Sequence, residues 1–124
     1  MIFGIGVDII RISRFEKWIK NPDILKRFFN PAEMASGETE VLTQHYAARF
    51  AAKEAFSKAL GTGVVGFGLK DVYIQTYSNG KPELVVTGKA LELMDGICGR
   101  GARVFVSLSH EKEYAVANVV IERG

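Results

Sequence analysis

A helical segment at residues 47–61 constrains this chain more than any other part of its sequence. It consists largely of good helix formers and ends at Gly61, a residue suited to a left-handed C-terminal cap. At about 100° per residue, four alanines fall within one narrow stripe of this helix: Ala48, Ala52, Ala55 and Ala59. Because these side chains are short, another element can approach the helix backbone closely there. The chain is therefore expected to fold around this helix.

The same helix carries two cations and a carboxylate. Arg49 and Lys53 are four residues apart and lie one above the other, and Glu54 follows Lys53 directly. Taken alone, this pattern is better explained by a solvated helix face with a Glu54–Lys58 ion pair than by a functional site. Two other segments change that balance.

These two segments place polar groups at the ends of predicted strands. Residues 1–10 form an apolar run with one acid, Asp8, and a carboxylate there is costly to bury unless it is paired or bound to a metal. Near the other terminus, a predicted strand ends in Ser109 and His110 and is followed by a second predicted strand at 114–121. These groups could converge with the helix acid, although none of them specifies a reaction alone.

Together the segments resemble the holo-[acyl carrier protein] synthases, the short bacterial class of 4′-phosphopantetheinyl transferases. Four stretches carry the resemblance in the same order: Gly4-Ile5-Gly6-Val7-Asp8-Ile9, residues 49–63, Asn79-Gly80-Lys81-Pro82 and Ser107-Leu108-Ser109-His110. Residues 28–45 and 95–102 match nothing diagnostic. The family often has glycine before the motif arginine, where this chain has Ala48, and that change is mild within a helix.

Composition limits the class of protein. With 124 residues, 48% of them hydrophobic and 24% charged, we expect one soluble domain spanning residues 1–124. No apolar stretch approaches the roughly 18–20 residues of a membrane span. The N-terminus lacks a basic region before its apolar run, so no signal peptide is expected. Cys98 is the single cysteine, which excludes an internal disulfide and a cysteine-based zinc site and suits a cytoplasmic protein.

The patterns predict an α+β fold, in which a mostly antiparallel sheet is packed by a long central helix and shorter helices. The expected strands are 2–9, 71–77, 82–87, 103–109 and 114–122, and the expected helical pieces are 12–20, 22–30, 31–37, 43–60 and 88–97. The segment 78–81 contains Asn-Gly, which accepts positive φ and predicts a hairpin. The last hairpin is rich in Val and Ala on both faces, which predicts burial on both sides, by helices or by another subunit.

The resemblance implies a reaction and a metal. Family members move the phosphopantetheine arm of coenzyme A to a serine of apo acyl carrier protein: the serine oxygen attacks the β-phosphorus and 3′,5′-ADP leaves. Such a transfer needs positioning, charge neutralisation and Mg²⁺ held by one or two carboxylates. Asp8 and Glu54 match the family's metal-binding acids and, with Lys53, are the predicted catalytic residues. Asp8 could instead cap the following helix. The serine would be deprotonated by Glu54 or by a magnesium-polarised water, and the sequence does not decide.

The resemblance also implies a binding site for coenzyme A. The expected residues are Arg49, Lys53, Lys58, Gly61, Thr62, Gly63, Lys81, Pro82, Ser109 and His110. For Arg49, a structural pair with an acid such as Asp71 or Glu38 is nearly as good an explanation. His45 lies in no matching motif and is expected at the surface or at the start of a helix.

A local basic stripe predicts where the carrier protein docks. The net charge of the chain is only +2, but the segment 12–20 places apolar residues on one face and cations on the other. Acyl carrier proteins are acidic helical bundles, and a basic stripe would steer and orient them. The expected carrier-binding residues are Arg14, Lys17, Lys20 and Phe28. Family members are homotrimers with coenzyme A between adjacent subunits, so a homotrimer is expected here.

Two other classes of function remain open from the sequence. A nucleic-acid-binding module could use the cations of residues 11–27, but no exposed aromatic residues for stacking accompany them and acids interrupt the stripe. An inactive interaction protein could keep the fold and bind acidic helices. Such a protein would tolerate the loss of Asp8 or Glu54, whereas the enzyme would not. We expect neither nucleic acid nor membrane as a partner.

Overall fold

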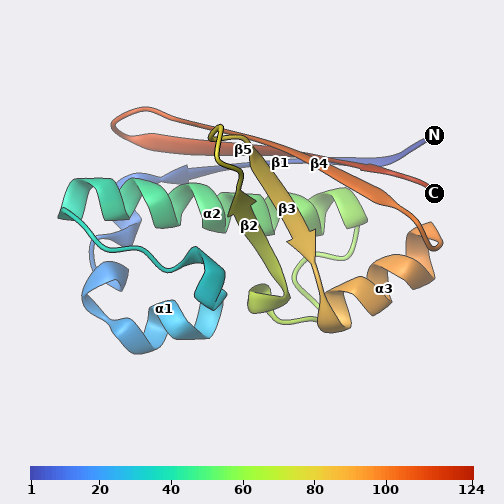
Figure 1. The fold of residues 1–124 in the computed structure, drawn as a ribbon, viewed down its shortest axis with the longest axis horizontal. Coiled ribbons are helices and arrows are strands. Elements are labelled where there is room, and N and C mark those ends of the chain that lie inside the picture. Colours follow the sequence, from blue (N-terminus) through green and yellow to red (C-terminus); the bar gives the residue numbers. More distant parts are fainter.

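Helix α2 (Thr39–Leu60) runs through the middle of the molecule, and the other elements pack on its two sides (Figure 1). The computed structural model describes residues 1–124. A sheet of the three longest strands covers one side: β1 (Ile2–Arg11), β4 (Arg103–His110) and β5 (Tyr114–Glu122). The shorter strands and helices lie on the other side, so the predicted α+β class and the central helix are confirmed.

The strands form two antiparallel sheets. The larger has the order β1-β5-β4, so β5 lies in the centre and β1 and β4 form opposite edges. The second is the hairpin of β2 (Val72–Thr76) and β3 (Pro82–Val86), joined through the predicted Asn-Gly turn, in which Gly80 has φ 87°. Strand β3 lies beside β4 but shares no ladder hydrogen bonds with it.

Strand β1 lies unusually close to α2. A Cβ atom added at Gly4 would lie 2.0 Å from the carbonyl oxygen of Ala59, and one added at Gly6 would lie 2.0 Å from that of Ala55. No side chain larger than hydrogen fits at either position. The alanine stripe of α2 and the two glycines of β1 therefore form one contact, and β1 is the element whose close approach the alanine stripe predicted.

The segment between β1 and α2 turns back under the helix, but it does not contain the predicted helix 12–20. It forms two 3₁₀ turns, η1 (Ile12–Phe15) and η2 (Trp18–Lys20), then α1 (Pro22–Phe28) and the 3₁₀ turn η3 (Pro31–Glu33). The apolar residues Ile12, Phe15 and Trp18 recur every three residues, which matches the 3₁₀ period rather than the α-helical one. Asn21 is extended because Pro22 follows it, and it caps α1.

The opposite end of the molecule holds α3 (Gly88–Cys98), and the 3₁₀ turn η4 (Leu69–Asp71) lies between α1 and α3 and contacts both. The core surrounds α2. It lies between the large sheet on one side of the helix and the shorter strands and helices on the other. No helix combines the length and the apolar character that a membrane crossing requires.

The outer face of the large sheet is uncovered. Ile5 is 67% exposed, Ile9 62%, Val7 52% and Phe105 48%. Within one protomer, the predicted burial of the last hairpin on both faces holds only for the face that packs on α2.

Candidate active site

The close contact between β1 and α2 sets the position of Asp8. Side chains alternate along β1, so Asp8 points to the same face as Gly4 and Gly6, towards α2. There Lys58 Nζ donates to Asp8 Oδ1 at 2.9 Å and to the carbonyl oxygen of Val7 at 3.1 Å. The Lys58 side chain is 53% exposed, which leaves it free to reach a ligand.

Glu54 lies in the same neighbourhood as Asp8. Partial burial raises the pKa of the Glu54 carboxyl, and the negative charge of Asp8 raises it further, against the opposing charges of Lys58 and Arg14. Two acids that meet without a shared hydrogen bond are an unfavourable arrangement unless a cation joins them. The structure therefore places Glu54 close enough to Asp8 for their charges to interact, and Lys58 forms its ion pair with Asp8 rather than with Glu54, the pair that the helix spacing alone suggested.

This donor set fits a magnesium ion. No group of three or more His, Cys, Asp or Glu side chains is arranged to hold a metal, which disfavours an all-protein zinc-type cage. Magnesium instead accepts one or two carboxylates and completes its octahedron with water and substrate phosphate oxygens. The partly exposed Asp8 and Glu54 carboxylates meet that requirement.

Arg14 of η1 belongs to the basic segment 12–20 and also lies near Glu54. Its guanidinium group is 5.8 Å from the centre of the Phe50 ring, and its charge acts on Glu54. Lys17 and Lys20 are exposed further along the segment, and Phe28 is half-buried and stacks on Trp18 at 5.3 Å. The predicted carrier-binding residues therefore lie on the segment between β1 and α2, and one of them, Arg14, is close enough to Glu54 for its charge to act there.

Lys53 lies elsewhere, in the core, and this corrects the prediction that it acts in catalysis and neutralises a phosphate. Its Nζ donates to Glu33 Oε1 at 2.6 Å and to the carbonyl oxygens of Leu69 and Val72 at 3.0 and 2.5 Å. The residue is 1% exposed, and all three N–H groups of the ammonium are used. One step along a helix rotates the side chain by about 100°, so Lys53 faces the core although Glu54 faces the site.

A second group of predicted residues lines a cavity of about 360 Å³ on the other side of α2. Arg49, Pro82 and His110 are in its walls, together with residues that were not predicted to bind coenzyme A: Val41, Gln44, His45, Ala48, Thr76, Gly80 and Leu108. A larger cavity of about 440 Å³, near the start of α2 and the β4–β5 turn, contains none of the predicted residues.

Arg49 is the residue most clearly prepared for a ligand in this cavity. Its terminal nitrogens donate weakly to the carbonyl oxygen of His45 at 3.3 Å and to Thr76 Oγ1 at 3.4 Å, while its buried Nε has no partner. Burial lowers the pKa of Arg49, and no carboxylate forms an ion pair with it. The suggested structural pair with Asp71 or Glu38 is therefore absent. Such a guanidinium fits an anion such as a phosphate.

The remaining residues predicted to bind coenzyme A lie outside the Arg49 cavity, on separate loops and on β4. Gly61 caps α2 with φ 88°, and Thr62 and Gly63 follow it in the loop that leaves the helix. Lys81 lies on the hairpin turn beside Pro82 but outside the Arg49 cavity. Ser109 alternates with His110 along β4, so it points to the outer face of the sheet. Within a single chain, Ser109 and His110 therefore face opposite sides of the sheet.

The two halves of the predicted site lie at opposite edges of the large sheet. Asp8 on β1 and Leu108 on β4 pair with the same residue of the central strand, Ala117. Two strand spacings, roughly 10 Å, separate the two edges, and α2 lies across the sheet between them. The Asp8–Glu54 pair and the Arg49 cavity therefore face different directions within one protomer.

Sequence reasoning missed His45 and Glu33. His45 lines the Arg49 cavity, and its Nε2 donates to the carbonyl oxygen of Glu33 at 2.6 Å; burial lowers the pKa of this imidazole. Glu33 ends a capping box that begins at Asn30. The spacing Asn30-Pro31-Ala32-Glu33 could have predicted the box, whereas no local signal marks His45.

Comparison with known proteins shows the family to which this chain belongs. The chain matches the model of the 4′-phosphopantetheinyl transferase superfamily over residues 4–119. It is 48% identical to a holo-[acyl-carrier-protein] synthase of Geobacter sulfurreducens, with 99% of both proteins covered. A second such synthase, from Treponema denticola, is 44% identical, with 98% of this chain and 99% of that protein covered.

Solved structures of the same kind share the fold. A holo-(acyl-carrier-protein) synthase from Bacillus anthracis in complex with CoA (3′,5′-ADP) aligns with a TM-score of 0.80 at 36% identity, covering 100% of this chain and 99% of that one. The Helicobacter pylori holo-[acyl-carrier-protein] synthase in complex with coenzyme A aligns with a TM-score of 0.78 at 32% identity, covering 95% and 99%.

Proposed function

This chain belongs to the 4′-phosphopantetheinyl transferase superfamily and transfers 4′-phosphopantetheine from coenzyme A to acyl carrier protein, and from that premise we propose which of its residues carry the reaction. The observation behind the proposal is the meeting of Asp8 and Glu54, which are far apart in the sequence, beside the half-exposed ammonium of Lys58. This is the arrangement that a diphosphate substrate with a divalent cation requires.

Asp8 and Glu54 would hold Mg²⁺. When bound, the ion would supply positive charge to the diphosphate of coenzyme A and to the transferring phosphoryl group. Lys58 would add a second positive charge from the same side, because its ammonium already lies 2.9 Å from Asp8 Oδ1 and its side chain is half exposed.

Glu54 would also accept the proton of the carrier serine. The serine oxygen forms a bond to the β-phosphorus, the bond from that phosphorus to the bridging oxygen breaks, and 3′,5′-ADP leaves with the electron pair. A raised pKa makes Glu54 a stronger base than an ordinary carboxylate, which suits this role. Arg14, whose charge acts on Glu54, would moderate that shift.

The nucleotide end of coenzyme A would occupy the Arg49 cavity. Arg49 offers a fork with an unpartnered buried Nε, and His110, Gly80 and Pro82 lie in the same walls. The parts of coenzyme A outside that cavity would contact the loop Gly61–Gly63 and Lys81. Backbone N–H groups of such a loop and a lysine ammonium can both bind phosphate oxygens.

A homotrimer with sites between subunits would join the two halves. In one protomer they lie at opposite edges of the sheet, so a single coenzyme A would contact the Asp8 edge of one subunit and the Arg49 cavity of the next. The uncovered apolar face of the sheet supports this proposal, because Ile5, Val7, Ile9 and Phe105 would be buried between subunits. Ser109 lies on that same face.

Mixing two inactive variants tests the shared site. Glu54→Gln removes one half and Arg49→Ala the other, so each homo-oligomer is expected to be inactive. After subunit exchange at equal concentrations, about a quarter of the interfaces would combine two intact halves, and activity would recover to about that fraction. Sites built within single chains would give no recovery. Sedimentation of each variant controls for loss of assembly.

The carrier protein would dock on Arg14, Lys17, Lys20 and Phe28. Reversing two charges with Lys17→Glu/Lys20→Glu is expected to raise the KM for apo carrier protein by roughly tenfold while leaving the affinity for 3′,5′-ADP unchanged. Both lysines are exposed and remote from the core, so the fold should be unaffected. Equal losses for the carrier and the nucleotide would contradict a separate docking surface.

The transfer itself is tested directly. The protein is incubated with apo acyl carrier protein, coenzyme A and Mg²⁺, and the carrier is expected to gain the mass of phosphopantetheine. Omission of the divalent ion should abolish the gain. Undiminished transfer after chelation would refute the proposed role of Asp8 and Glu54 in holding the ion.

A further inference from the structure

The segment 12–38, which carries the proposed carrier-binding residues, is attached to α2 in two different ways. Its first part is held by aromatic contacts: Phe15 and Trp18 lie 5.5 and 5.3 Å from the Phe50 ring. Such contacts bury apolar area, but they are weakly directional and permit small displacements. Its second part is held by directional bonds around Glu33.

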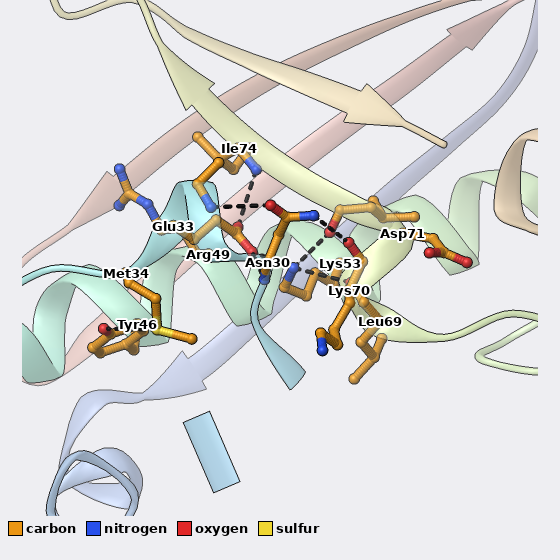
Figure 2. Close-up of polar contacts among 12 residues, drawn as sticks. Asn30, Glu33, Met34, Tyr46, Arg49, Lys53, Leu69, Lys70, Asp71 and Ile74 are labelled. Atoms are coloured by element: carbon orange, nitrogen blue, oxygen red, sulfur yellow. Dashed lines mark hydrogen bonds and ion pairs between the residues drawn. The ribbon is translucent and has the colours of Figure 1, made fainter. Parts of the chain in front are cut away.

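Glu33 is a carboxylate whose side chain is fully buried, and both of its oxygens are used. Oε1 accepts from the backbone N–H of Asn30 at 3.1 Å and from Lys53 Nζ at 2.6 Å, and Oε2 accepts from the backbone N–H of Ile74 at 3.0 Å. One side chain thus joins η3, α2 and β2. Figure 2 shows Asn30, Glu33 and Lys53 converging between these elements.

Further bonds surround this centre. Asn30 Nδ2 donates to the carbonyl oxygen of Lys70 at 3.1 Å, and the backbone N–H of Ala35 donates to the Tyr46 hydroxyl at 3.0 Å. His45 donates to the carbonyl oxygen of Glu33. The end of segment 12–38 is therefore fixed to α2 from one side and to β2 and η4 from the other.

The residue that holds Glu33 is the neighbour of the proposed base. Lys53 points from α2 into this network, while Glu54 points from the same turn of the helix to Asp8. A rigid helix turn therefore connects the anchor of the docking segment to the reacting carboxylate. A buried ion pair contributes little stability compared with apolar packing, but it permits only one arrangement of its surroundings.

We propose that the Glu33–Lys53 pair is a positioning device for catalysis, which fixes segment 12–38 relative to Glu54 and so aligns the carrier serine with bound coenzyme A. The pair touches neither substrate. This proposal depends on one part of the proposed function, namely that the carrier protein docks on segment 12–38. Loss of the pair should therefore weaken the use of carrier protein and leave the binding of nucleotide intact.

The test uses two variants and one control. Lys53→Met removes the ammonium, and Lys53→Met/Glu33→Gln removes both charges so that no unpaired charge is buried if the single variant fails to fold. Met94→Ala creates a cavity in α3, at the opposite end of the molecule from α1, and controls for loss of stability alone (Figure 1). For each folded protein, the measurements are kcat, the KM for apo carrier protein, the affinity for 3′,5′-ADP by calorimetry and amide hydrogen exchange by mass spectrometry.

The proposal expects a selective pattern. The KM for carrier should rise about tenfold or more in the Lys53 variants, while the affinity for 3′,5′-ADP changes by less than about twofold. Faster exchange should be confined to residues 12–38 and to residues 69–74, which the pair also contacts, with β5 still protected. A carrier KM no higher than that of Met94→Ala, or exchange that rises equally in segment 12–38 and β5, would overturn the proposal.

The outcome is separable from that of the docking surface. If Lys17→Glu/Lys20→Glu leaves the carrier KM unchanged, the docking surface itself is misplaced and the proposal fails with it. If that variant behaves as expected and the Lys53 variants do not, only the positioning role is refuted.

Discussion

Helix α2 separates two charged clusters that differ in how completely their groups are satisfied. On its inner side, Lys53 and Glu33 are buried, all three N–H groups of the Lys53 ammonium donate, and both carboxylate oxygens of Glu33 accept hydrogen bonds. On its outer side, Asp8 and Glu54 are two like charges with one exposed lysine between them. Adjacent residues of one motif, Lys53 and Glu54, therefore belong to different clusters.

The contrast indicates which charges serve the fold and which serve a ligand. A charge is buried at a cost of several kcal/mol unless its partners are complete, so the satisfied cluster has no capacity left for a substrate. In the outer cluster, the charges of Asp8 and Glu54 repel each other in the free protein. A bound cation would relieve that repulsion. We therefore propose that the outer cluster, and not the inner one, binds the cation.

The largest expected effect comes from breaking the inner cluster. Lys53→Met leaves Glu33 as a buried charge without its cation, and we expect a loss of about 3–5 kcal/mol in the free energy of unfolding. The matched variant in the outer cluster, Lys58→Met, should cost less than about 1 kcal/mol, because that ion pair is half exposed. Urea unfolding of both variants measures the difference. Similar losses would contradict the distinction between the clusters.

The next effect concerns the outer cluster and turnover. Glu54→Gln removes the proposed base and half of the metal site, so kcat should fall by at least about 100-fold. The protein should stay folded, because Glu54 makes no side-chain hydrogen bond. Steady-state assays with saturating coenzyme A and carrier protein measure the loss, and circular dichroism checks the fold. Glu54→Gln with near-normal turnover would remove Glu54 from the mechanism.

The sequence predicted the outer cluster better than the inner one. The alanine stripe predicted that another element approaches the backbone of α2, and the structure shows that this element is β1, at Gly4 and Gly6. Because side chains alternate along a strand, the same contact directs Asp8 towards α2. Family membership now decides against the nucleic-acid-binding and inactive alternatives.

The inner cluster escaped prediction because its partners are tertiary. Lys53 has the same residue type and spacing whether it faces a phosphate or the core, and only the position of Glu33 on a distant 3₁₀ turn decides. In the segment 12–20, the order of cations and apolar residues fits an α-helix as well as a 3₁₀ helix. The period of three at Ile12, Phe15 and Trp18 is the local signal that favours the observed 3₁₀ turns. Likewise, the separation of Asp8 from Arg49 depends on strand order, which no local pattern contains.

The smallest expected effect is the pH dependence that the outer cluster gives to stability. Burial and Asp8 raise the pKa of Glu54 in the folded protein, so the folded state keeps this proton to higher pH than the unfolded chain does. Stability from this group is therefore complete below the unfolded pKa and is lost as pH rises through the folded pKa. Glu54→Gln should consequently unfold at a higher urea concentration than the native protein at pH 8, and the difference should shrink towards pH 5.

Magnesium sharpens the comparison of urea midpoints at pH 8. Without Mg²⁺ the Glu54→Gln variant should be the more stable protein, whereas with Mg²⁺ the native protein should be the more stable one. A cation bound to the ionised pair stabilises the folded state by about 1.4 kcal/mol at a concentration ten times its dissociation constant. Glu54→Gln lacks half of the site and should respond far less. Urea midpoints at pH 5 and pH 8, each with and without Mg²⁺, measure both effects in one set. An advantage of the variant that does not depend on pH, or equal stabilisation of both proteins by Mg²⁺, would mean that the two acids do not form a shared cation site.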